Sequence, residues 1–122
     1  MLGPTEQPGG TMTRLFMLLL PEGQLGEECG MLCCEDDGTF HGFAQAHDIG
    51  VEMGPRGNYA DDGTTLDFMG EAMAVPMAQP ITEVPRLEPW LAKATQKAPG
   101  KWEGTYIFRG AQYPFKLILV NP

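Results

Sequence analysis

Short apolar runs, separated by turns rich in glycine, proline and aspartate, follow one another from residue 11 to the end of the chain. Some runs alternate apolar and polar positions, as Ile49, Val51 and Met53 do against Gly50 and Glu52. This period of two is typical of a half-buried β-strand. The runs predict strands over residues 11–20, 29–34, 40–47, 49–53, 64–75, 102–109 and 113–120.

Aspartate-glycine turns join several of these predicted strands. Asp36, Asp37 and Gly38 form one such turn, and Asp61 to Gly63 form a second of the same kind. Aspartate tolerates turn geometry and glycine supplies a positive φ. The first turn therefore predicts a hairpin between the strands over 29–34 and 40–47. We expect the strand over 49–53 to end at the Gly54-Pro55-Arg56-Gly57 sequence.

The pattern of apolar runs separated by turns changes between residues 76 and 98. Prolines at positions 76, 80, 85 and 89 predict a surface linker, because proline cannot donate a backbone hydrogen bond to a sheet. After Pro89, the side chains of Trp90, Leu91, Ala94 and Ala98 would share one face of a helix. The pattern therefore predicts one short helix near residues 88–98.

The last two strands form an aromatic hairpin in this interpretation. A turn centred on Gly110 and Ala111 would place Tyr106 opposite Phe115 and Trp102 opposite Leu119. Proline at 114 favours a four-residue loop over 109–112 with Pro114 at an edge or a bulge.

These elements predict an all-β, mainly antiparallel fold: a small barrel or sandwich of seven or eight strands with one short helix near residues 88–98. The glycine-punctuated meander, the late helix and the strand with Trp102, Gly104 and Tyr106 loosely resemble calycin-like barrels, mainly over residues 87–120. We assign no family from this resemblance.

The length of 122 residues fits one domain, expected over 11–122 after a flexible tail at 1–10. The net charge of −8 disfavours nucleic acid and anionic membrane surfaces as partners. The apolar run at 15–20 is too short for a secretory signal or a membrane span. Three cysteines, Cys29, Cys33 and Cys34, are an odd number, and the vicinal pair would point to opposite faces of a strand. Together these features favour reduced thiols in a cytoplasmic protein.

Charge is divided unevenly along the chain. Residues 1–85 contain fourteen acidic and two basic residues, whereas residues 86–122 contain two acidic and six basic ones. The two parts could attract each other within the fold, or the acidic part could face a basic protein partner. For the second hypothesis, the predicted partner-binding residues are Glu27, Glu28, Glu35, Asp36 and Asp37.

The sequence offers little for catalysis or metal binding. His41 and His47 share a strand face but lie about 20 Å apart along it, too far to ligate one metal. Acidic neighbours would raise the pKa of the Cys33 and Cys34 thiols and weaken them as nucleophiles. We expect no metal site and no cofactor. An enzyme that uses His41 or an aspartate pair such as Asp61-Asp62 is the third hypothesis.

The leading hypothesis is a non-enzymatic domain that binds a small apolar or amphipathic ligand. Five aromatic residues are its predicted ligand-binding set: Trp90, Trp102, Tyr106, Phe108 and Phe115. Gly42, Ala44 and Ala46 share one face of their strand and could leave room inside a barrel. Methionines, which adapt to irregular spaces, could line such a cavity at positions 31, 53, 69, 73 and 77.

Overall fold

The computed structural model describes residues 13–21, 27–46, 50–78 and 84–121. The described residues form eight strands and no helix. The strands are β2 (Arg14–Pro21), β3 (Glu27–Cys34), β4 (Thr39–Ala46), β5 (Val51–Asp61), β6 (Thr65–Pro76), β7 (Leu87–Ala98), β8 (Lys101–Phe108) and β9 (Ala111–Leu119). None of the described segments is a helix long and apolar enough to cross a bilayer.

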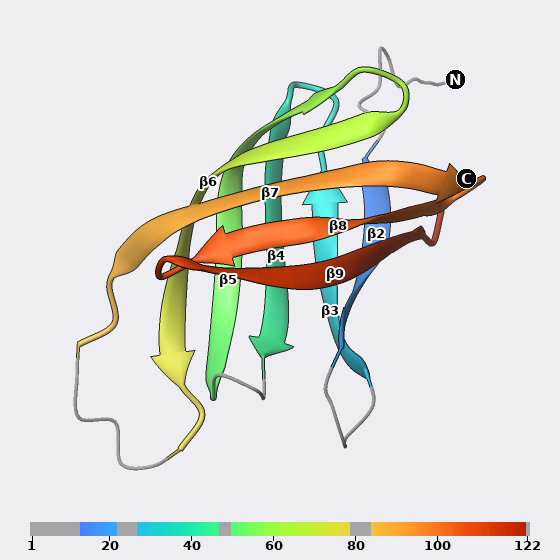
Figure 1. Cartoon of the computed structure of the whole chain (residues 1–122). Helices are drawn as coiled ribbons and strands as arrows, with labels where there is room; N and C mark the ends of the chain where they lie inside the picture. The colour runs from blue at the N-terminus through green and yellow to red at the C-terminus, as the bar shows by residue number, and fades with distance from the viewer. Residues whose placement is uncertain (1–12, 22–26, 47–49, 79–83, 122) are drawn as a thin grey trace, which may run out of the picture.

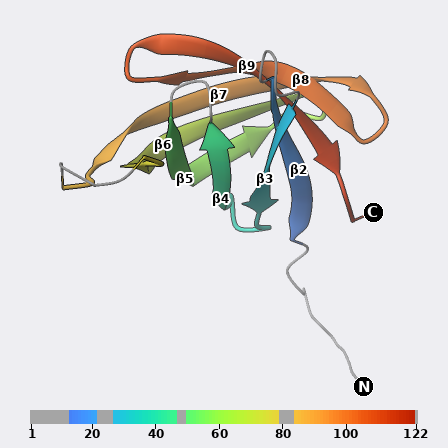
Figure 2. The same ribbon diagram turned by 90° about the horizontal axis from the view of Figure 1, so that it is seen from below.

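The eight strands form a closed antiparallel barrel. Each strand pairs with the next one along the chain, and β9 pairs with β2 to close the ring. In Figure 1, β7, β8 and β9 cross steeply in front of β2 to β6, and Figure 2 shows the same two sides from below. The all-β class and the barrel predicted from the sequence are therefore confirmed.

The helix predicted near residues 88–98 is wrong, because this segment is strand β7. Trp90, Ala92 and Ala94 are buried inside the barrel, while Leu91 and Lys93 between them are exposed. β7 pairs along its length with both β6 and β8. Its alanine and lysine content suits a helix, but the hydrogen bonds and the burial gained by closing the barrel outweigh that local preference.

The final hairpin differs from the predicted register by two residues. Tyr106 pairs with Tyr113 and Trp102 pairs with Leu117. The turn is the two-residue Arg109-Gly110, with φ of 55° and 77°, which is the type I′ geometry that matches strand twist. In this register Pro114 falls opposite Thr105 in a pair that exchanges no backbone hydrogen bonds, so the longer loop is unnecessary. The inward face was nevertheless correctly predicted, because a shift of two keeps side-chain parity.

β5 continues through the glycine-proline sequence that we expected to end it. Pro55 is buried and pairs with Ala72 of β6. The ladder between β4 and β5 is interrupted beside Pro55, between the His41–Arg56 and Ala44–Met53 pairs. The missing N–H of proline is therefore accommodated where no ladder partner is required.

Aromatic rings fill the centre of the barrel. Trp90 stacks on Tyr106 with ring centroids 5.8 Å apart, and its ring lies 5.7 Å from that of Phe40. Phe40 and Trp90 lie in one row across the sheet, and the two residues between them in that row are Gly57 and Gly70, which pair directly with each other. With no side chain at either glycine, the two large rings can meet across this row.

Candidate functional site

The predicted ligand-binding aromatics all point into the barrel. Trp102 is the most exposed of the five, at 8%, and packs edge-on against Phe16 at 5.3 Å. Tyr106 contacts the rings of both Trp90 and Phe115. The five aromatic residues therefore lie together in the packed core, and their contact with a ligand stays a prediction.

Small inward residues border this aromatic core on two strands. β4 contributes Gly42, Ala44 and Ala46, as its sequence pattern indicated, and β6 contributes Gly70, Ala72 and Ala74. The four alanines are at most 3% exposed, so this side of the barrel is closed. Among the methionines predicted to line a cavity, Met53 is buried, whereas Met31, Met69 and Met73 are exposed on the outer surface.

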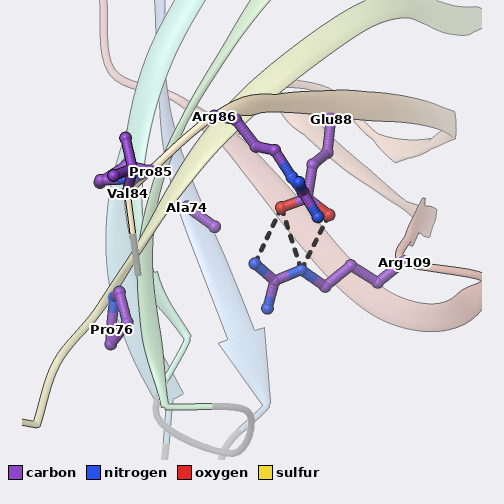
Figure 3. Close-up of a pocket in the computed structure, with 7 residues that line it drawn as sticks. All are labelled: Ala74, Pro76, Val84, Pro85, Arg86, Glu88 and Arg109. Carbon is purple, nitrogen blue, oxygen red and sulfur yellow. Dashed lines mark hydrogen bonds and ion pairs between the residues drawn. The ribbon is translucent and has the colours of Figure 1, made fainter. Parts of the chain in front are cut away.

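A pocket opens at the end of the barrel where β6 stops and β7 starts (Figure 3). Its volume is about 190 Å³. Its lining combines small or apolar residues with three charged ones: Ala74, Pro76, Val84, Pro85, Arg86, Glu88 and Arg109. We call this hollow the mouth pocket.

The charged side of the mouth pocket is organised by an ion pair. Glu88 accepts hydrogen bonds from Arg109 through both carboxylate oxygens, Nε to Oε1 at 2.9 Å and Nη2 to Oε2 at 2.8 Å. This bidentate contact lowers the pKa of Glu88 below its usual value, and the charges of Arg109 and Arg86 act in the same direction. Arg109 also lies over the Phe108 ring at 5.2 Å. Glu88 therefore stays ionised and holds Arg109 in place.

Arg86 lies beside this pair, with its guanidinium directed toward Glu88 in Figure 3. No hydrogen bond or ion pair joins Arg86 to another residue within the described parts of the chain. The three charged side chains of the mouth pocket sum to one positive charge, in a chain with a net charge of −8. The pocket is thus a local positive site that Ala74 and Pro76 also line.

Sequence reasoning missed Arg86, Glu88 and Arg109 as a group. The predicted helix begins at Glu88, and Arg109 falls where the predicted strand over 102–109 meets the predicted loop over 109–112. Once the segment is understood as a strand, Glu88 shares inward parity with Trp90 and Ala92, and an acidic residue on an apolar inward face is the signal that was available.

The predicted partner-binding acids are divided between the two ends of β3. Glu27 and Glu28 begin the strand, and Glu35, Asp36 and Asp37 follow its other end, about 23 Å away at the rise of an extended strand. Asp37 accepts hydrogen bonds from the backbone and hydroxyl of Thr39, which lower its pKa. These acids therefore form two separate groups, and their role in partner binding stays a prediction.

The residues of the enzyme hypothesis lie outside the barrel interior. His41 is exposed on the outer face, paired across strands with Cys33 and Arg56, while His47 lies outside the described residues. Asp61 forms an ion pair with Arg14 at 2.9 Å, and Asp62 accepts hydrogen bonds from the backbone of its own turn. Within the described segments, no three His, Cys, Asp or Glu side chains are grouped to hold a metal ion.

The vicinal cysteines point to opposite faces of β3, as expected. Cys33 is partly exposed and Cys34 is fully buried, and neither forms a disulfide. Burial raises the pKa of the Cys34 thiol to about 12. Cys34 is therefore a protonated core side chain at neutral pH.

Comparisons with known proteins found no match: no protein family, no curated protein sequence and no solved structure corresponds to this chain. These comparisons give no support to the resemblance to calycin-like barrels, and the late helix that was one of its features is a strand. The barrel is established, and any function must be argued from its own side chains.

Proposed function

We propose that the protein is a non-enzymatic binder of a small amphipathic carboxylate, which it takes into the mouth pocket. The observation that carries this proposal is the position of Arg86, a guanidinium with no ion-pair partner among the described residues, in a pocket that Ala74 and Pro76 also line. Small-molecule sites typically combine an apolar lining with a few convergent polar groups.

Arg86 suits a carboxylate because a guanidinium presents parallel N–H donors that match two carboxylate oxygens. Arg109 has the same chemistry, but its guanidinium already binds Glu88. Glu88 interacts with the charges of both arginines, but two guanidinium groups beside one carboxylate leave a net positive charge. An incoming anion thus contacts Arg86 and is attracted by the local positive charge.

The size of the mouth pocket limits the ligand. Its 190 Å³ is below the range of about 300–1,000 Å³ typical of drug-sized ligands. The side chains of Val84, Pro85 and Pro76 offer the ligand an apolar surface next to Ala74. A short unbranched carboxylic acid fits this combination of size, charge and lining.

Octanoate is expected to bind at least tenfold more tightly than 1-octanol, since only the acid can pair with Arg86. Arg86→Gln should weaken octanoate binding by about tenfold or more, because a charge-assisted hydrogen bond contributes about 1.5–3 kcal/mol. Isothermal titration calorimetry measures all three affinities.

Lys97→Gln is the matched control, because it removes the same charge from an exposed position of β7 outside the mouth pocket. Its octanoate affinity should equal that of the unchanged protein. Equal weakening in both variants, or no octanoate binding at all, would contradict the proposal.

The two other functional hypotheses have less structural support. A partner-binding acidic surface would have to use two groups of acids at opposite ends of β3. A catalytic His41 would have to work on the exposed outer face, where Cys33 opposite it has a pKa raised by burial and by Glu35. We therefore prefer the ligand-binding proposal.

A further inference from the structure

The outer face of β2, β3 and β4 carries an exposed apolar surface. Met17, Met31 and Phe43 are direct neighbours in one row across these strands, which lie side by side in Figure 1. Met31 is 44% and Phe43 50% exposed. Ile118 of β9 extends the row, because it pairs with Met17. The outer patch consists of this row and the leucines of the two rows beside it: Leu15, Met17, Leu19, Met31, Phe43 and Ile118.

The outer patch is uncharged. The outward side chains of β2 are Leu15, Met17 and Leu19, which alternate with buried Phe16 and Leu18. Charged residues make up 20% of the chain, so an uncharged surface across neighbouring strands is not expected from composition alone. A contiguous apolar surface of this kind marks an interaction site, and the chemistry that fits it is another apolar surface.

The two flanks of the outer patch carry opposite charges. On the β9 side Lys116 pairs with Leu19. On the β5 side Glu52 pairs with Gln45 and accepts a hydrogen bond of 2.7 Å from its amide. Leu19 and Gln45 both lie two residues beyond the row of Met31, toward the same end of the barrel. A two-fold rotation about an axis along β3 exchanges the flanks, because β9 and β5 are each two strands away from β3.

We infer that the outer patch binds a second copy of this chain, in a symmetric dimer whose two-fold axis runs along β3. Met31 then faces Met31 of the other copy, and Met17 faces Phe43. Each Lys116 lies opposite a Glu52 at the rim, where the convex barrels diverge and only long side chains reach across. A symmetric contact needs one self-complementary surface, and an apolar centre between a positive and a negative flank is such a surface.

The area of the outer patch determines how strong this dimer is. Three rows on four strands, with about 4.8 Å between strands and about 6.7 Å between rows, project to about 390 Å². A standard stable interface buries about 800 Å² on each partner, so this contact belongs to the weak, transient class. The charge of −8 on each copy also opposes association. We therefore expect a dissociation constant of about 0.1–1 mM.

A second exposed apolar row lies on the outer face of β6, β7 and β8. Met69, Leu91 and Ile107 pair directly in this row. It is one row wide, because the next row contains the charged pair of Asp67 and Lys93. The outer patch is three rows wide and is therefore the better apolar surface for a second copy. The narrower row supplies a matched control position.

Small-angle X-ray scattering in 0.15 M salt, which screens exposed charges beyond about 8 Å, measures the association. Up to about 2 mM protein, the unchanged chain should show a mass that rises from 13.3 kDa toward twice that value. Met31→Lys should stay monomeric, because two lysines would meet at the axis. Met69→Lys makes the same change at an exposed position outside the outer patch and should dimerise like the unchanged protein. A monomer at the highest concentration, or equal loss in both variants, would overturn the inference.

Reversing the rim charges tests the two-fold arrangement. Lys116→Glu and Glu52→Lys should each weaken the dimer about threefold or more, because each variant places like charges opposite one another at both rims. The double variant exchanges the two signs and should recover the affinity of the unchanged protein. Backbone amide signals that shift on dilution should belong to β2, β3 and β4. A double variant that does not recover, or shifts concentrated in β6 to β8, would overturn the inference. The mouth pocket is lined by other strands, so the proposed function stands or fails separately.

Discussion

Gly104→Ala is expected to destabilise the barrel by about 4 kcal/mol or more, or to prevent its folding. Gly104 lies in β8 directly opposite Ala94 of β7. A Cβ atom at this glycine would overlap the backbone carbonyl of Lys93 and crowd the Cα of Ala94. Backbone atoms cannot turn aside as a side chain can, so the two strands would have to separate. Urea denaturation followed by circular dichroism measures the change in the free energy of unfolding.

Gly54→Ala provides the matched control, because it makes the same chemical change in β5. The nearest atom to a Cβ at Gly54 would be the carbonyl oxygen of Gly42 at 3.5 Å, an ordinary contact. This variant should change stability by less than about 1 kcal/mol. A loss below about 1 kcal/mol for Gly104→Ala would contradict the close approach of β7 and β8.

Phe115→Ala is expected to cost about 3–5 kcal/mol, since it removes a large side chain from a packed core. Phe115 is 1% exposed, lies opposite Gly104 and contacts the Tyr106 ring at 6.1 Å between centroids. The surrounding strands are held by barrel closure and can collapse into the cavity only in part. Thermal or urea unfolding measures the loss.

Phe43→Ala is the control for this second prediction. Phe43 is 50% exposed on the outer face of β4, so its truncation should cost less than about 1 kcal/mol. Similar losses for the two variants would mean that the inward face of the final hairpin is misassigned.

Strand positions were predictable wherever the side-chain period was clear. β4 and β6 lie close to their predicted ranges, because their apolar and polar residues alternate and their ends coincide with turns. The prediction for the segment of β7 was wrong because Trp90 and Ala94 share one face in a helix and in an extended strand alike. Only the pairing of β7 with β6 and β8, which is non-local, decides between them.

The register of the last hairpin shows a similar limit. The sequence was enough to predict which side chains of β8 point inward, because Trp102, Tyr106 and Phe108 form its apolar face. The turn position was not predictable, because Arg109 adopts a positive φ that is uncommon for a residue other than glycine, asparagine or aspartate. In this turn Arg109 places its guanidinium on Glu88, so the same residue determines both the register and one side of the mouth pocket.

The uneven charge of the two parts of the chain is expressed in few direct ion pairs between them among the described residues. The ion pairs among the described residues join Arg14 to Asp61, Arg56 to Glu71 and Arg109 to Glu88. The first two lie within the acidic part and the third within the basic part. Attraction between the two parts is present at β7, where the charge of Lys93 contributes to lowering the pKa of Asp62.

The most direct test of the central claim is to locate bound octanoate by NMR, through nuclear Overhauser effects between its chain protons and the protein. Binding in the mouth pocket predicts contacts with the methyl group of Ala74 and the side chain of Val84, together with a shift of the Arg86 side-chain N–H signal. Contacts confined to exposed outer residues such as Met69 and Leu91 would contradict it, as would the absence of any specific contact at saturating octanoate.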